Sequence, residues 1–113
     1  MKNNSNNQQS SHLELKFIAI WGAVSGGIEL EREQAIIPGR RYRFDFVHHR
    51  SMVAVEINGA TWRKGGHSSG TGLARDYEKA NLAVLHGWRV FSLSGDMLTV
   101  EWAGRIAGFI RDC

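Results

Sequence analysis

The chain has 113 residues, of which 42% are hydrophobic and 22% are charged, with a net charge of +3. This is the composition of one globular domain, and it excludes a chain that is disordered throughout. A lone cysteine, Cys113, excludes a disulfide framework and a cysteine-rich zinc site. No apolar run approaches the roughly 20 residues of a membrane span, and no secretory signal follows Met1. We therefore expect a soluble protein of a reducing compartment, without a membrane partner.

The first 24 residues divide into a polar segment and a helix. Residues 1–10 are rich in Asn, Gln and Ser and have no apolar residue after Met1, which predicts a disordered tail ahead of a single domain over residues 11–113. Ser11 and Glu14 have the spacing of a capping box, which predicts that a helix begins at Ser11. Apolar residues then recur at helical intervals up to about Val24.

Three strands are predicted next. Residues 28–37 alternate in part between apolar and charged side chains, as in a half-exposed edge strand. Residues 41–47 alternate cleanly, with Tyr42, Phe44 and Phe46 expected on one face. Residues 52–57 are nearly all apolar, which indicates a buried strand.

The second half of the chain opens with a glycine-rich loop. Residues 58–72 hold five glycines, and a loop of this length is commonly functional. A helix is predicted over residues 73–86, ended by Gly87, followed by a strand over residues 88–93. Asp96 or Thr99 then caps a last helix that runs to about Arg111. The first of these helices is expected to have a basic face and an apolar face: Arg75, Lys79 and His86 on one, and Leu73, Tyr77, Ala80 and Val84 on the other.

The predicted order is αβββαβα, an α/β fold with a mixed central sheet flanked by helices. A helix joins the third and fourth strands, and such a crossover predicts that they are parallel.

The charge is unevenly distributed along the chain. Residues 34–75 contain seven basic side chains and two carboxylates, Asp45 and Glu56, which gives this segment +5. If the hairpin turn is centred between His49 and Arg50, paired residue numbers sum to 99, so that Asp45 and Glu56 are diagonal neighbours on one face. Arg43 then lies opposite Glu56. Two readings follow: a structural ion pair between Arg43 and Glu56, or a divalent metal held by the two carboxylates.

Several segments together resemble the PD-(D/E)XK nuclease superfamily. They are RRYRFDF, VAVEINGATW, GGH and DYEKANLAVLHGWRVFSL, within residues 13–95. They look most like small phage and bacterial endonuclease-like proteins, and are more distantly similar to very-short-patch mismatch endonucleases and DUF559-type proteins.

The resemblance implies a restriction-endonuclease-like core and a Mg²⁺-dependent DNA endonuclease, with Mn²⁺ as a substitute ion. Asp45 and Glu56 would hold the metal, with the Ile57 carbonyl as a further ligand. Asn58 stands where the superfamily has its lysine, so another amine is required. Lys79 is the favoured replacement, with Lys64 and His67 as the other options.

Further residues have assigned roles with open alternatives. Glu14 either completes the metal shell or only caps its helix with Ser11. His67, in its glycine-rich loop, is either a proton-transfer or phosphate-binding group or a solvated histidine. Five basic residues are expected to bind the DNA backbone: Arg41, Arg43, Arg63, Lys64 and Arg75. The alternative is that these side chains only keep the surface soluble.

Other functions remain open at this stage. The absent motif lysine favours a catalytically impaired nucleic-acid-binding module on the same fold. The remaining alternatives are a dimeric Holliday-junction resolvase, an endonuclease that cleaves mismatched DNA, and a structural phage or bacterial protein. In each case the expected place is the cytoplasm of a bacterium or of a phage-infected host cell.

Overall fold

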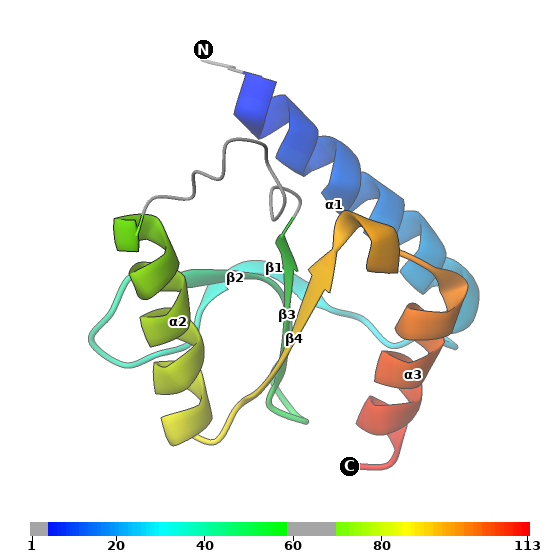
Figure 1. Ribbon diagram of the computed structural model, residues 1–113. Helices are drawn as coiled ribbons and strands as arrows, with labels where there is room; N and C mark the ends of the chain where they lie inside the picture. Colours follow the sequence, from blue (N-terminus) through cyan, green and yellow to red (C-terminus); the bar gives the residue numbers. More distant parts are fainter. Residues whose placement is uncertain (1–4, 59–69) are drawn as a thin grey trace.

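The computed structural model describes the backbone of residues 5–58 and 70–113, and the side chains of residues 12–58 and 72–113. The order of its elements is the predicted αβββαβα, with one short 3-10 turn, η2, added before the last helix (Figure 1). The elements are α1 (Ser5–Val24), β1 (Glu31–Ala35), β2 (Arg43–His48), β3 (Val53–Asn58), α2 (Gly70–Leu85), β4 (Arg89–Ser94), η2 (Gly95–Met97) and α3 (Val100–Arg111).

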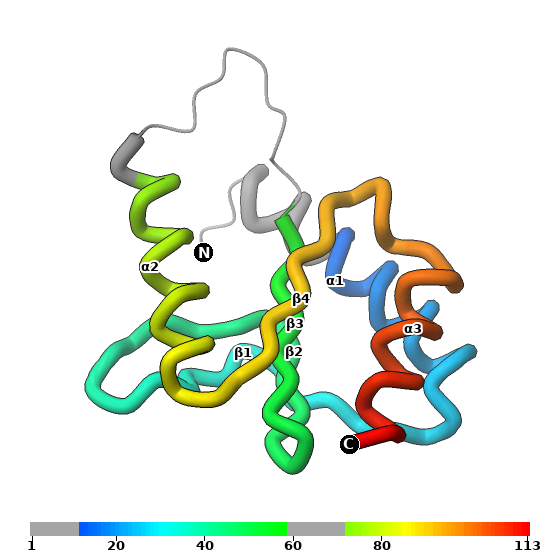
Figure 2. The backbone as a smooth tube through the Cα atoms, turned by 60° about the horizontal axis from the view of Figure 1, so that its bottom comes forward, coloured from blue at the N-terminus to red at the C-terminus, as the bar shows by residue number. Residues whose placement is uncertain are grey.

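The four strands form one mixed sheet in the order β1-β2-β3-β4. The first three are antiparallel, and β4 is parallel to β3, as the helical crossover predicts. The sheet separates α2 from the pair α1 and α3, so the domain has three layers (Figure 2). The predicted α/β class and mixed sheet are therefore confirmed.

Each face of the sheet has its own hydrophobic cluster. The larger one packs Phe17 and Trp21 of α1 against Phe46 of β2 and Ile106 of α3. The smaller one packs Phe44 and Val47 of β2 against Ala83 of α2. Phe44 and Phe46 thus belong to opposite clusters, which corrects the clean alternation predicted for this strand: the side-chain pattern changes at the residue between them, Asp45.

The first helix is longer than predicted. Its backbone is helical from Ser5, so residues 5–10 continue the helix where the composition predicts a tail. Glu14 lies more than two turns inside α1, and its buried carboxylate pairs with Arg32. The predicted helix start at Ser11 and the capping role of Glu14 are therefore wrong. Among the described residues, no helix is long and apolar enough to cross a membrane.

The side of α2 that packs on the sheet is not its apolar face. Ala83 is fully buried, and Lys79 is half-buried beside the sheet. Leu73, Tyr77 and Val84 are exposed. This helix therefore carries an apolar surface that the described domain does not cover. The predicted end of the helix is confirmed, since Gly87 has a φ of 90°.

The β2–β3 hairpin has a different register from the predicted one. His48 pairs with Val53 and Phe46 with Val55, so paired numbers sum to 101 rather than 99. The turn has four residues, 49–52, closed by a hydrogen bond of 3.1 Å from Met52 N to His49 O, with Met52 at a φ of 57°. The pairing ends at Phe46 and Val55, one residue before the point where the side-chain pattern of β2 changes, at Asp45. The predicted diagonal placement of Asp45 and Glu56 on one regular face is therefore not the arrangement in the structure, in which the Asp45 carboxylate bonds to the backbone of β3.

The last helix begins at one of its two predicted caps. The Thr99 Oγ1 accepts a hydrogen bond of 3.1 Å from Trp102 N at the start of α3. Asp96, the other predicted cap, lies in η2.

Candidate metal centre

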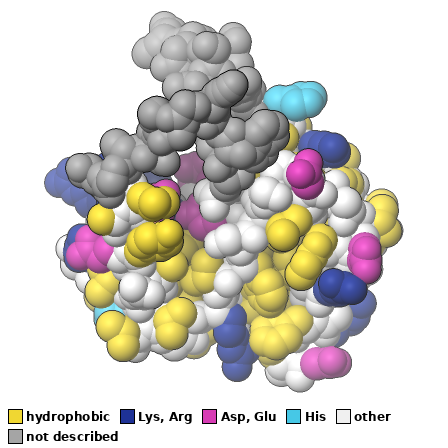
Figure 3. Space-filling model, in the orientation of Figure 1, with side chains coloured by type: hydrophobic (Ala, Val, Ile, Leu, Met, Phe, Trp, Pro, Cys, Tyr) yellow, Lys and Arg dark blue, Asp and Glu magenta, His cyan; other side chains and the backbone are white. Residues whose placement is uncertain are grey.

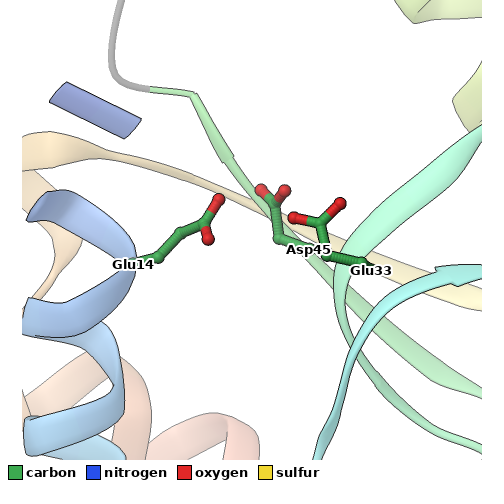
Figure 4. Close-up of side chains that lie close together, drawn as sticks. All are labelled: Glu14, Glu33 and Asp45. Carbon is green, nitrogen blue, oxygen red and sulfur yellow. The ribbon is translucent and has the colours of Figure 1, made fainter. Parts of the chain in front are cut away.

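Three carboxylates converge at the edge of the larger core cluster. Glu14 projects from α1, Glu33 from β1 and Asp45 from β2, and one oxygen of each lies within 4.8 Å of the others (Figure 4). Glu14 is buried, Asp45 is half-buried and Glu33 is exposed. The cluster therefore reaches from the interior to the surface, with Asp45 in the middle.

Strand pairing extends this cluster into a row across the sheet. Arg32 pairs with Phe46 and Gln34 with Phe44, which places Glu33 opposite Asp45. On the other side of Asp45, Glu56 of β3 is close enough for the charge of Asp45 to contribute to the raised pKa of Glu56. Side chains at directly opposite positions have Cβ atoms about 4.5–5.5 Å apart, and like charges there are destabilising. A row of three carboxylates on neighbouring strands thus needs positive charge nearby.

Glu33 enters the row through an unusual backbone conformation. Its φ of 51° is in the left-handed region, where a non-glycine residue is uncommon. Residues in such conformations are concentrated at functional sites, because the strain persists only where surrounding contacts hold it.

Asp45 is fixed by the neighbouring strand. One of its oxygens, Oδ2, accepts a hydrogen bond of 2.7 Å from the backbone N–H of Ile57. Ile57 itself is half-buried next to Glu56 on β3. Asp45 therefore touches the part of β3 that the sequence predicts to line the site.

Glu56 has a cationic partner from the opposite half of the chain. The Lys79 ammonium of α2 forms an ion pair with Glu56 Oε2, and both side chains are mostly buried, at 18% and 16% exposure. Lys79 Nζ also lies 4.5 Å from the centroid of the Phe44 ring. Asn58 is exposed at the end of β3, so the amine in this site comes from α2.

The predicted ion pair between Arg43 and Glu56 is replaced by this one. Arg43 is exposed and its backbone position pairs with Ala35 of β1. The shift of the β2–β3 register by two residues removes Arg43 from the predicted position opposite Glu56.

Burial and neighbouring charges shift two of these carboxyl groups. Burial raises the pKa of Glu56 to about 7; the hydrogen bond from Lys79 opposes this rise, and the charge of Asp45 adds to it. Burial also raises the pKa of Glu14, against the hydrogen bond from Arg32, with Asp45 and Glu33 adding to the rise. Glu56 is therefore poised to gain or lose a proton near neutral pH.

The charge balance of this site favours a divalent cation. Four carboxylates (Glu14, Glu33, Asp45, Glu56) are matched in their described contacts by two cations, Arg32 and Lys79. When all four are ionised, two negative charges are uncompensated. Carboxylate oxygens are the ligands that Mg²⁺ and Mn²⁺ prefer. The residues present therefore fit a hard divalent ion, although nothing in their arrangement selects one such ion over another.

The other predicted site residues lie in three places. Arg41, Arg43 and Arg75 are exposed. Arg63, Lys64 and His67 lie outside the described residues. Glu33 and Arg32 belong to the site but were not predicted from the sequence, because their positions depend on the β1 register and on the left-handed φ of Glu33.

Comparison with known proteins gives one informative similarity. No protein-family model matches the sequence, and no curated protein matches it significantly. Among solved structures, the fold is similar to that of the catalytic domain of the homing endonuclease I-Bth0305I, with a TM-score of 0.59 and 17% sequence identity. The match covers 88% of this chain and 90% of that one. At this identity the similarity establishes the shared fold.

Proposed function

We propose that this protein is a metal-dependent DNA endonuclease that hydrolyses phosphodiester bonds, in the manner of the PD-(D/E)XK nucleases. The observation that carries the proposal is a lysine beside a carboxylate cluster: Asp45 lies within the cluster of Glu14 and Glu33 and influences Glu56, and Lys79 pairs with Glu56. The fold supports it, since the structural neighbour is the catalytic domain of a homing endonuclease.

Asp45 is the central ligand of the proposed metal site, with Glu14 and Glu33 beside it. The Ile57 carbonyl is a further candidate ligand; Glu56, predicted from the sequence as a ligand, is proposed instead to act beside the metal through its pair with Lys79. When bound, Mg²⁺ would supply Lewis-acid polarisation of the phosphate and lower the pKa of a coordinated water. The hydrogen bond from Ile57 N holds the orientation of Asp45. Arg32 pairs with Glu14, so the negative charge of this carboxylate is balanced within the protein.

The Glu56–Lys79 pair is suited to proton transfer next to this site. A general base is most effective when its pKa is close to the working pH, and the pKa of Glu56 is raised to about 7. We propose that Glu56 accepts a proton from the attacking water as the water oxygen bonds to phosphorus. The bond from phosphorus to the leaving oxygen breaks, and the leaving oxygen takes a proton from solvent. Lys79 holds Glu56 in place and offsets charge on the phosphate, which is the role of the motif lysine that Asn58 replaces.

The exposed arginines Arg41, Arg43 and Arg75 are proposed to contact the DNA backbone. Such contacts give affinity without reading sequence and make binding sensitive to salt. Arg63, Lys64 and His67 remain predictions of the same kind. In the space-filling view, acidic side chains lie in a hollow beside α2, the helix that carries Lys79 (Figure 3).

The direct test is cleavage of supercoiled, branched and mismatched DNA in the presence of Mg²⁺ or Mn²⁺. Asp45→Asn retains an oxygen that can accept the Ile57 N–H but removes the charge, so we expect cleavage to fall by at least about 10²-fold. Glu29→Gln, an exposed carboxylate ahead of β1, is the matched control and should cleave like the wild type. Equal cleavage by wild type and Asp45→Asn would refute the assignment.

Asn58 favours a second candidate, a nucleic-acid-binding module without catalysis. In that case the wild type binds DNA in a salt-dependent way and cleaves none of the substrates with either ion. Asn58→Lys would then be expected to restore cleavage, whereas in the proposed enzyme Lys79 already supplies the amine.

A further inference from the structure

One side of α2 presents an apolar stripe that no other described part of the domain covers. Leu73, Tyr77 and Val84 are 40%, 62% and 59% exposed, and Ala80 lies between them. Figure 3 shows hydrophobic side chains along the surface of α2 in the view that has β4 in front. Contiguous exposed apolar surface is commonly an interaction site in a folded protein.

The charged residues of α2 do not belong to this stripe. Glu78 accepts hydrogen bonds from Tyr42 (2.7 Å) and Arg40 (3.2 Å) on a different side of the helix. At about 100° per residue, every stripe residue is turned by at least about 100° from Glu78. Lys79 points toward Glu56. The stripe is therefore an uncharged surface, separate from the metal centre.

The spacing of the stripe is the same when read in either direction. Its members are separated by four, three and four residues, which is the seam spacing of helices that pack side by side. If two copies of α2 lie antiparallel about a twofold axis, Leu73 of one copy meets Val84 of the other. Tyr77 then meets Ala80, so that each contact joins a larger side chain to a smaller one.

The neighbouring positions are compatible with the same pairing. Asp76 of one copy is placed against Asn81 of the other, so no like charges oppose each other across the seam. A surface that is complementary to itself forms a closed twofold dimer. We propose that α2 is the interface of a homodimer in which Leu73, Tyr77, Ala80 and Val84 pair antiparallel with the same residues of a second copy.

This dimer is independent of the proposed nuclease activity, because none of the four residues belongs to the metal centre. A 16-residue helix is only about 24 Å long, so the seam is small. Interfaces below about 1,200 Å² are typical of weak complexes, and association should depend on protein concentration.

Sedimentation equilibrium of the full chain over a wide concentration range is the first test. We expect a monomer–dimer equilibrium that Tyr77→Glu and Val84→Glu each shift to monomer, with unchanged circular dichroism because both side chains are exposed. Leu15→Glu, on the 60% exposed Leu15 of α1, is the control and should dimerise like the wild type. A monomer at every concentration, or a dimer that both α2 variants leave intact, would overturn the proposal.

Disulfide trapping tests the register. In a Cys113→Ser background, the double variant Leu73→Cys/Val84→Cys should form an oxidised covalent dimer. Leu73→Cys alone should not, because the two copies of residue 73 would be about 16 Å apart along the helices, beyond the roughly 7 Å limit for disulfide-linked Cα atoms. Efficient trapping by the single variant, or none by the double variant, would contradict the antiparallel pairing.

Discussion

The Lys79 ammonium of α2 pairs with the Glu56 carboxylate of β3, 23 residues earlier in the chain. Residues 59–69 separate these two elements, so the pair forms only when α2 packs on the sheet. The state of Glu56 on β3 therefore depends on whether α2, in the second half of the domain, is folded against the sheet.

Replacing the lysine should reduce stability and activity together. Lys79→Met leaves the mostly buried Glu56 without its cation, and we expect a cost of about 1–3 kcal/mol at pH 8, where Glu56 is ionised. Urea denaturation measures this cost, with Lys16→Met on the exposed side of α1 as the control. In the double variant with Glu56→Gln, much of the loss should be recovered. Additive losses would show that the two side chains do not act as a pair.

Stability without added metal should depend on pH through Glu56. Its pKa is about 7 in the folded protein and near 4.3 in an unfolded chain. The folded state therefore binds this proton more tightly, and the stabilisation present at low pH is lost as the pH rises through about 7. Denaturation at pH 5.5 and pH 8 should show a decrease in unfolding free energy that Glu56→Gln removes. The control is Glu101→Gln, which replaces an exposed carboxylate of α3. In this variant the unfolding free energy should decrease with pH as in the wild type.

Glu33 should contribute to metal affinity although it is exposed. Glu33→Gln keeps the side-chain shape but removes one charge from the cluster, and we expect Mn²⁺ affinity to fall on the order of 10-fold, the lower end of the effect of residues that support a metal site. Titration calorimetry measures this, with Glu29→Gln as the matched control. An unchanged affinity in Glu33→Gln would exclude Glu33 from the site.

The contacts of Tyr42 predict a phenol whose pKa is higher than usual. Its hydroxyl donates a hydrogen bond of 2.7 Å to Glu78 Oε1, which, with burial and the negative charge of Glu78, raises the pKa of Tyr42. In Glu78→Gln the charge is absent, so the pKa of Tyr42 should move toward its ordinary value of about 10. Absorbance titration, with Tyr42→Phe to assign the signal, checks this. A phenol that titrates identically in both backgrounds would mean that the Tyr42–Glu78 contact is not maintained in solution.

The sequence was sufficient for those parts of the site that depend on local pattern. The two isolated carboxylates of the basic segment, Asp45 and Glu56, do lie near each other, and the predicted helix in the second half of the chain carries Lys79, which pairs with Glu56. The exact register was missed because the turn has four residues with Met52 in the left-handed region. Glu33 and Arg32 were missed because their positions depend on pairing between strands. The exposure of Leu73, Tyr77 and Val84 does not follow from the sequence, because an exposed apolar stripe has the same periodicity as a core-facing one.

The hydrogen bond from Ile57 N to Asp45 Oδ2 has a consequence for ligand binding. It restricts the rotamers of Asp45 through contact with a strand that is itself fixed in the sheet. The conformational entropy of this side chain is therefore lost when the protein folds and not when an ion binds. Asp45 is in this sense a preorganised ligand, and binding of a cation at this position requires little further ordering of the side chain.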